Sequence, residues 1–182
     1  MLCAATSLAF FALLRVSEFT SPTRFSFLSH RTLLTGDIHI RNHSISLRIR
    51  ASKTDQEQRG QTILIGCTHT AACPVELLSS YITQAHPLPA NAPLFQWKNG
   101  TYLTPSKFNT VLKQALTAVG ANQRHFSTHS LRIGGATAAA AAGIEPNIIQ
   151  ELGRWRSQCF RRYTRAPNSR LYSTAGAMSN HK

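Results

Sequence analysis

The run of small residues from His129 to Gly143, "HSLRIGGATAAAAAG", constrains the fold of this chain more than any other segment. Alanine has the highest helix propensity, and glycine commonly stands where a helix ends. We therefore expect a helix over residues 129–142, with Ala138–Ala142 allowing neighbouring helices to pack closely against it. On this helix His129 and Arg132 would share one face and point into one cavity.

The rest of the chain reads as further helices around one group of strands. The segments "LLTGDIHI" and "HSISLRIR" alternate apolar and polar residues, and "QTILIG" adds a third short strand, with "ASKTDQEQRG" connecting the last two. Apolar spacing, proline and glycine signals predict helices over residues 2–15, 74–85, 105–120, 145–153 and 157–165. The predicted fold class is mainly α with a small antiparallel three-stranded β-sheet (α+β).

The charge balance of the chain is strongly basic. Twenty Lys and Arg residues stand against seven Asp and Glu, which gives a formal net charge of +13. Such an excess favours nucleic acid as the partner, because neutralising phosphates releases counterions. A membrane surface is the alternative, but no basic amphipathic helix is present to bind one. The seven scattered acids barely suffice for the carboxylates of a two-metal nuclease, so we expect phosphodiester chemistry without metal.

The four cysteines suggest neither a disulfide framework nor a standard metal site. The segment "CTHTAAC" from Cys67 to Cys73 includes His69, but its spacing fits no common zinc site and no second ligand pair follows. We therefore expect no bound metal and reduced thiols, as in a cytosolic or nuclear protein.

The first fourteen residues, "MLCAATSLAFFALL", are uncharged and mostly apolar. They resemble the apolar region of a signal peptide, but they lack a basic start and a clear cleavage site, and they are too short to span a bilayer. We expect a helix buried in the core. A chain that opens directly on a core helix is expected to be the back half of a longer protein.

Several polar residues are spaced along the chain in a notable order. Arg15 ends the first predicted helix, and Glu18 lies close enough to orient it. Lys53 lies in the predicted hairpin turn. Trp155 lies in a turn between two helices, and Tyr163 follows eight residues later. Taken singly, each of these residues has an ordinary structural explanation, such as a packed aromatic ring or a solvated charge. A functional interpretation therefore depends on all of them together.

The set resembles the catalytic domain of the tyrosine recombinases, the phage integrase family. The family pattern Arg…Lys…His-x-x-Arg…His/Trp…Tyr is matched at Arg15, Lys53, His129, Arg132, Trp155 and Tyr163. The sequence segments "LLRVSEF", "SKTDQ" and "LGRWRS" are most similar to those of recombinases from eukaryotic mobile elements of the DIRS or Crypton kind. The resemblance implies a catalytic domain over residues 1–167 and a polar tail over 168–182, without the N-terminal core-binding domain that members usually carry.

The resemblance also implies a reaction. DNA strands would be cut and rejoined through a covalent 3′-phosphotyrosine intermediate, without metal, ATP or any other cofactor, for recombination or integration of a mobile element. Tyr163 would be the nucleophile and Lys53 the general acid, while Arg15 and Arg132 would bind the non-bridging phosphate oxygens. His129 would assist proton movement near the tyrosine hydroxyl.

The remaining roles are supporting ones. Trp155 would donate its indole N–H to a phosphate oxygen, and Glu18 would brace the site. DNA phosphate contacts are expected from the following surface arginines: Arg154, Arg156, Arg161, Arg162 and Arg165. The expected partners are double-stranded DNA and, in the full-length protein, further copies in a tetramer on paired sites, with no membrane. The expected location is the nucleus or, outside the mobile-element interpretation, the cytoplasm.

Three alternatives stay open at this point. A type IB topoisomerase shares the chemistry, and a non-catalytic DNA-binding remnant of a mobile element would keep the motif without cleavage. A covalent adduct that disappears in Tyr163→Phe distinguishes an enzyme from such a remnant. A metal-dependent nuclease would lose its activity in EDTA, whereas a recombinase would be indifferent to chelators.

Overall fold

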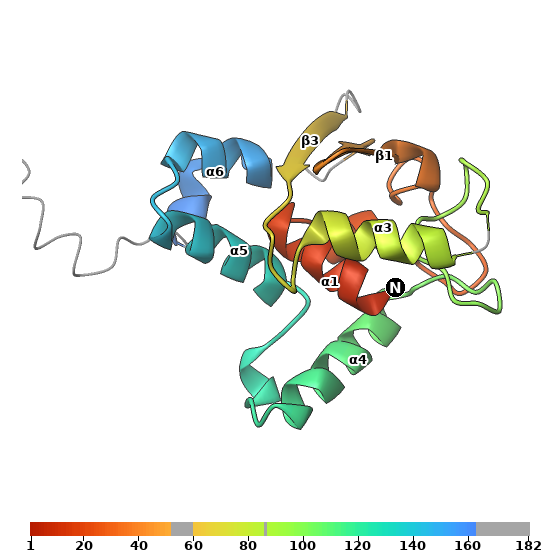
Figure 1. Cartoon of the computed structure of the whole chain (residues 1–182). Coiled ribbons are helices and arrows are strands. Elements are labelled where there is room, and N and C mark those ends of the chain that lie inside the picture. The colour runs from red at the N-terminus through yellow and green to blue at the C-terminus, as the bar shows by residue number, and fades with distance from the viewer. Residues whose placement is uncertain (52–59, 86, 163–182) are drawn as a thin grey trace, which may run out of the picture.

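The structure, a computed structural model, describes residues 1–51, 60–85 and 87–162. The elements are α1 (Leu2–Phe11), α2 (Val16–Phe19), the 3-10 helix η1 (Thr35–Asp37), β1 (Ile38–Arg41), β2 (Ser44–Ile49), β3 (Gln61–Gly66), α3 (Pro74–Gln84), α4 (Pro105–Ala118), η2 (Gln123–His125), α5 (Ser130–Ala141), α6 (Pro146–Gly153) and η3 (Gln158–Arg162). Figure 1 shows α1 near the centre, with α3 beside it, α5 and α6 at one end, and the sheet against the helices. The predicted fold class is confirmed.

The three strands form one antiparallel sheet in the order β1-β2-β3. Leu47 of the middle strand pairs with Ile38 on one side and Ile63 on the other. These three side chains are at most 9% exposed, whereas Leu64, one residue further along β3, is 75% exposed. One face of the sheet therefore covers the core and the other faces solvent, as the alternating pattern predicts.

Helix α1 is the central element of the core. Its residues Ala5 and Leu8 have no exposed surface, and it packs on α3 and on α5. The prediction of a buried helix at the start of the chain is confirmed. None of the helices in the described part of the chain has both the length and the apolar character needed to cross a bilayer.

The predicted end of this first helix is wrong. A helix over residues 2–15 was expected from composition, but α1 ends at Phe11 and Leu13 takes the left-handed conformation, with φ of 48°. Leu13 is 1% exposed and packs in a second apolar cluster, so tertiary burial overrides its helix propensity. As a result, Arg15 caps the start of α2 instead of ending α1.

The close approach of α5 to α1 depends on Gly135. A Cβ atom there would lie 2.3 Å from the carbonyl oxygen of Phe10, and the next residue, Ala136, is completely buried. The prediction that Ala138–Ala142 allow close helix packing is confirmed in part: Ala139 and Ala140 are half-buried and pack with Ile149 and Phe160, whereas the first and the last two of these alanines are exposed. Alanine favours a helix on any face, so composition alone does not reveal which face is packed.

A second apolar cluster fixes the end of the described chain. Phe160 of η3 is 1% exposed and packs with Leu13, Ala136 and Ile149. Its ring stacks on Trp155 with 5.8 Å between centroids. The predicted helix over residues 157–165 appears, in its described part, as a short 3-10 helix held by this phenylalanine.

Candidate active site

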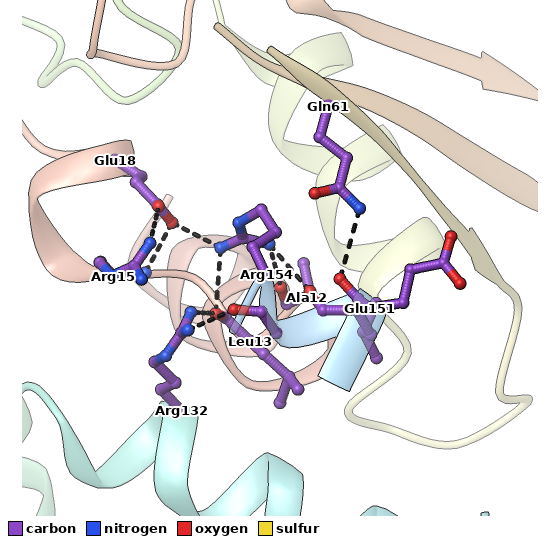
Figure 2. A network of polar contacts seen from close by, with 10 residues as sticks. Ala12, Leu13, Arg15, Glu18, Gln61, Arg132, Glu151 and Arg154 are labelled. Atoms are coloured by element: carbon purple, nitrogen blue, oxygen red, sulfur yellow. Dashed lines mark hydrogen bonds and ion pairs between the residues drawn. The ribbon is translucent and has the colours of Figure 1, made fainter. Parts of the chain in front are cut away.

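Glu18 is the carboxylate around which the candidate site is built. The backbone N–H of Arg15 donates to Glu18 Oε2 at 2.8 Å, and Arg15 Nη1 donates to Oε1 at 3.0 Å. From the other side, Arg154 Nη2 donates to Oε2 at 2.7 Å (Figure 2). The Glu18 side chain is 4% exposed, so these bonds replace the water that a buried carboxylate would lose. The predicted contact between Glu18 and Arg15 is confirmed.

Arg132 joins three segments that are far apart in the sequence. It lies in the first turn of α5, and its guanidinium donates to the carbonyl oxygens of Leu13 and Gly153. Its guanidinium carbon lies 4.3 Å from the centre of the Trp155 ring, which is a cation–π distance. The two carbonyls belong to the turn after α1 and to the last residue of α6. The turn after α1, α5 and the end of α6 therefore meet at one cation.

Arg154 occupies a position that the sequence analysis assigned to the surface. It follows α6 in the left-handed conformation, with φ of 55°, and it is 7% exposed. Besides Glu18, its guanidinium binds the carbonyl oxygens of Ala12, Leu13 and Leu152 at 3.0–3.3 Å. The prediction of an exposed, DNA-contacting Arg154 is at odds with this burial. The left-handed turn carries the side chain inward, and the pattern "RWRS" does not show which arginine turns in.

The site carries more positive than negative charge. Among the residues that the structure describes, three guanidinia, of Arg15, Arg132 and Arg154, lie around one carboxylate, that of Glu18. Burial lowers the pKa of Arg132 to about 9, and the charges of Arg15 and Arg154 act in the same direction, while Glu18 opposes them. Burial also lowers the pKa of Arg154. Because these cations are desolvated and repel one another, an anion placed among them would be bound favourably.

His129 does not share an enclosed cavity with Arg132. It is the N-cap of α5, is exposed, and donates its backbone N–H to Ser127 Oγ at 3.2 Å. Arg132, three residues later, is 5% exposed. His129 has helical dihedral angles and its carbonyl accepts the N–H of Ile133 at 3.0 Å, but the prediction that both side chains point into one cavity is at odds with their different burial.

Comparison with known proteins identifies the fold. A model of the phage integrase family matches residues 2–170. The chain belongs to the phage integrase family. This membership confirms the predicted resemblance to the tyrosine recombinases. No curated protein matches the sequence.

Solved structures of two recombinases and of a transposon integrase are similar to this chain in fold. XerA recombinase is 18% identical, with a TM-score of 0.69 over 98% of this chain and 57% of that one. XerH recombinase bound to difH in a pre-cleavage complex is 16% identical, with a TM-score of 0.68 over 98% and 46%. The Tn1549 transposon integrase in complex with circular intermediate DNA is 15% identical, with a TM-score of 0.62 over 98% and 57%. The chain spans about half the length of these proteins.

The structure brings part of the integrase pattern together. Arg15 and Arg132 meet near Glu18, and Trp155 lies against Arg132. Lys53, Tyr163 and Arg165 lie outside the described residues. The other three arginines predicted on the surface are exposed, namely Arg156, Arg161 and Arg162.

Sequence reasoning misassigned one residue that builds this candidate site, Arg154, and missed two others, Gly135 and Gly153. Arg154 shares Glu18 with Arg15. Gly135 allows α5 to reach α1. At Gly153 a Cβ atom would lie 1.7 Å from the Trp155 ring, so only glycine leaves room for that indole. The double glycine "GG" was the one available signal for close packing, but it does not show which of the two faces α1.

Proposed function

We propose that this integrase-family chain cleaves and rejoins DNA strands through a covalent 3′-phosphotyrosine intermediate, with Tyr163 as the nucleophile. The observation that carries the proposal is the cationic cluster around Glu18, in which Arg15 and Arg132 are held by partners that fix their guanidinia. A phosphodiester is the anion that this cluster suits, because its two non-bridging oxygens match two planar donor groups.

The arginines would act by stabilising charge that develops on the phosphate. Arg15 is bound to Glu18 through one side-chain nitrogen, and its side chain is 17% exposed, so it faces the rim of the cluster. Arg132 is fixed by two carbonyls and by the Trp155 ring before any substrate arrives. Such preorganised donors cost no rearrangement in the transition state, and each is typically worth about 3 kcal/mol.

The proposed chemical step balances without an external energy source. The Tyr163 oxygen attacks phosphorus, the bond from phosphorus to the 5′ oxygen breaks, and the leaving oxygen takes a proton from Lys53. The exposed His129 would take the proton of the tyrosine hydroxyl. A second 5′-hydroxyl then reverses these steps. The phosphotyrosine bond conserves the energy of the broken bond, so ATP is not needed.

The anchoring of the chain before Tyr163 supports this assignment. Phe160 lies three residues earlier and is buried against Leu13 and Ala136. Trp155, which touches Arg132, also stacks on Phe160. The segment that leads to the nucleophile is therefore joined by direct packing to the residues proposed to bind the phosphate.

The biological setting is proposed on the same basis. Two observations support double-stranded DNA as the substrate. The chain has a net charge of +13, and its fold is similar to that of XerH in a pre-cleavage and a post-cleavage complex with its difH substrate. The likeness in fold to a transposon integrase supports a mobile element. The sequence segments similar to eukaryotic DIRS or Crypton recombinases are the basis for proposing a nuclear location. We propose further that the chemistry is independent of metal and that the whole protein acts as a tetramer on paired sites.

A suicide-substrate experiment tests the proposal. Nicked duplexes of random sequence are incubated with the chain in magnesium-free buffer, and covalent protein–DNA adducts are resolved on a denaturing gel. We expect an adduct with the unmodified chain and with the control Tyr172→Phe, and none with Tyr163→Phe, which should still bind DNA. DNA binding without any adduct would support a non-catalytic remnant, and cleavage only with added Mg²⁺ would support a metal-dependent nuclease.

A further inference from the structure

The turn between β3 and α3 gathers metal-binding side chains away from the arginine cluster. Cys67 directly follows β3, Cys73 is the N-cap of α3, and Glu76 lies in the first turn of that helix. The Sγ atom of Cys67 lies 3.7 Å from His69 Nδ1, 3.5 Å from Glu76 Oε1 and 3.2 Å from Cys73 Sγ. The ligand atoms of Cys67, His69 and Glu76 all lie within 4.8 Å of one another.

We propose that this cluster binds one Zn²⁺ ion, with Cys67, His69 and Glu76 as ligands and Cys73 as the fourth. A tetrahedral zinc ion with Zn–S bonds of about 2.3 Å and Zn–N bonds of about 2.0 Å separates neighbouring ligand atoms by roughly 3.5–3.8 Å. The distances from Cys67 to His69 and Glu76 fall within this range. The two sulfur atoms are closer, at 3.2 Å, and the group whose ligand atoms lie within 4.8 Å of one another comprises Cys67, His69 and Glu76 without Cys73. The Cys73 thiol therefore has to reorient toward the other three ligands when the ion binds.

The donor set selects the metal. Two sulfurs, one imidazole nitrogen and one carboxylate oxygen suit zinc, whereas Mg²⁺ and Ca²⁺ prefer oxygen ligands throughout. Four protein ligands fill a tetrahedron, which is typical of a structural zinc site, since a catalytic site keeps one position for water or substrate.

The backbone of the turn holds these ligands in place. The N–H of Cys67 donates to the His43 carbonyl at 2.7 Å, and the N–H of Cys73 donates to the Thr70 carbonyl at 2.9 Å. His69 has φ of 52°, a left-handed conformation that residues with a side chain rarely adopt. Such conformations cost about 1 kcal/mol or more and are concentrated at functional sites. Here this conformation brings the imidazole within 3.7 Å of the Cys67 sulfur.

The zinc ion would have a structural role. It would join the end of β3 to the start of α3, the helix that packs along α1. Strand β3 also ends the hairpin whose connection contains Lys53. The ligands share no residue with the arginine cluster, so this inference does not depend on the proposed function, and strand cleavage would still need no metal at the phosphate.

The spacing of the cysteines and the histidine in "CTHTAAC" alone predicts no metal site. Glu76 was not part of that pattern. It lies nine residues after Cys67, and the first turn of α3 brings its carboxylate back to the sulfur. The alternative for two thiols 3.2 Å apart is a disulfide, in which an oxidant removes two electrons and two protons and the sulfur atoms close to about 2.05 Å.

Metal titration of the full chain under reducing conditions tests the site. After metal removal, Zn²⁺ is titrated in competition with a chromophoric chelator, and Co²⁺ is followed by absorption, because cobalt bound to thiolate gives an intense charge-transfer band. We expect one ion per chain, the cobalt band, and a higher unfolding temperature with Zn²⁺. Cys67→Ser should abolish the band and weaken Zn²⁺ binding at least 100-fold, whereas Cys159→Ser, at an exposed cysteine outside the cluster, should change neither.

A second variant keeps the test decisive if Cys67→Ser does not fold. Glu76 is exposed, so Glu76→Gln should fold, and we expect it to weaken Zn²⁺ binding at least tenfold. Binding of less than one ion per chain, a cobalt band that survives Cys67→Ser, or an affinity unchanged in Glu76→Gln would overturn the proposal. So would a Cys67–Cys73 disulfide, found by mass spectrometry, in a chain that binds no Zn²⁺ after reduction.

Discussion

The arginines inside the candidate site and those on the surface beside it differ in their exposure to solvent and in their bonding partners. Arg132 and Arg154 are at most 7% exposed and bind backbone carbonyls, a tryptophan ring or Glu18. Arg156 and Arg161 are exposed, although one of them lies only two residues after Arg154. A buried cation needs fixed partners to replace water, whereas an exposed one keeps its hydration.

This difference assigns the two sets to different tasks. The inner set, Arg132 and Arg154, is held in fixed positions by its partners. Fixed donors suit transition-state stabilisation at one phosphorus atom. The outer set, Arg156 and Arg161, adds charge that attracts DNA regardless of sequence. Each of these arginines contributes a small, salt-dependent amount of binding free energy. Four predictions, from the largest expected effect to the smallest, test this division.

Removing the carboxylate at the centre of the inner set should have the largest effect. Glu18→Ala removes the carboxylate that Arg154 Nη2 binds at 2.7 Å, and breaking such a buried pair typically costs about 3–5 kcal/mol of unfolding free energy. Urea denaturation measures this loss. The matched control is Glu151→Ala, with an expected change within about 0.5 kcal/mol, because its side chain is exposed and the Gln61 amide binds its backbone carbonyl. A loss below about 1 kcal/mol for Glu18→Ala would show that the inner arginines do not need the carboxylate.

Replacing Arg132 by lysine should reduce cleavage while the charge is kept. An ammonium cannot bridge the Leu13 and Gly153 carbonyls and lie flat on Trp155 at the same time. We expect the rate of adduct formation to fall about 100-fold, the usual effect of losing one preorganised donor. Arg156→Lys, on the surface, is the control and should leave the rate unchanged. Equal rates for both variants would mean that the inner position has no special role.

The packing that holds the inner set can be tested at two adjacent glycines. In Gly135→Ala the new methyl would lie 2.3 Å from the Phe10 carbonyl oxygen, so we expect a loss of about 1–3 kcal/mol. In Gly134→Ala the nearest atom, Phe10 Cε2, is 3.5 Å away, so the gain in helix propensity should stabilise the protein by up to about 1 kcal/mol. Denaturation of both variants gives the comparison. Similar stabilities would contradict the close approach of α5 to α1.

The outer arginines should affect binding alone, and only slightly. Arg156→Gln and Arg161→Gln each remove one phosphate contact, so the slope of log K against log salt should decrease by about 1 per substitution. Fluorescence anisotropy with labelled duplex over a range of salt concentrations measures the slope. The rate of adduct formation at saturating DNA should not change. A slope that stays constant would remove these residues from the DNA-binding surface.

Much of the fold could be predicted from local patterns. The three strands, the buried first helix and the helices that begin at Pro74, Pro105 and Pro146 are all present, because apolar periodicity and proline position act within a few residues. The exact end of α1 could not be predicted, because Leu13 takes a strained backbone conformation for the sake of contacts with Ala136 and Phe160.

The candidate site was predictable in a different way. Resemblance to a family pattern singled out Arg15 and Arg132, which the structure brings together near Glu18. It could not separate Arg154 from Arg156, since both follow α6 in a basic stretch. Nor could it add Glu76 to the cysteines and histidine of the β3–α3 turn, because that contact depends on how the turn places Cys67 against the first turn of α3.

The sequence by itself determined the class of this protein: a basic, mainly helical chain with one small sheet and the residue order of the integrases. These properties follow from composition, short-range periodicity and the order of side chains, none of which requires contacts between distant segments. Only the tertiary structure decided which arginines are buried, because burial depends on how the turn after α1, α5 and the end of α6 meet. The packing of these three segments decides whether a charged side chain is a fixed part of a site or a hydrated surface charge.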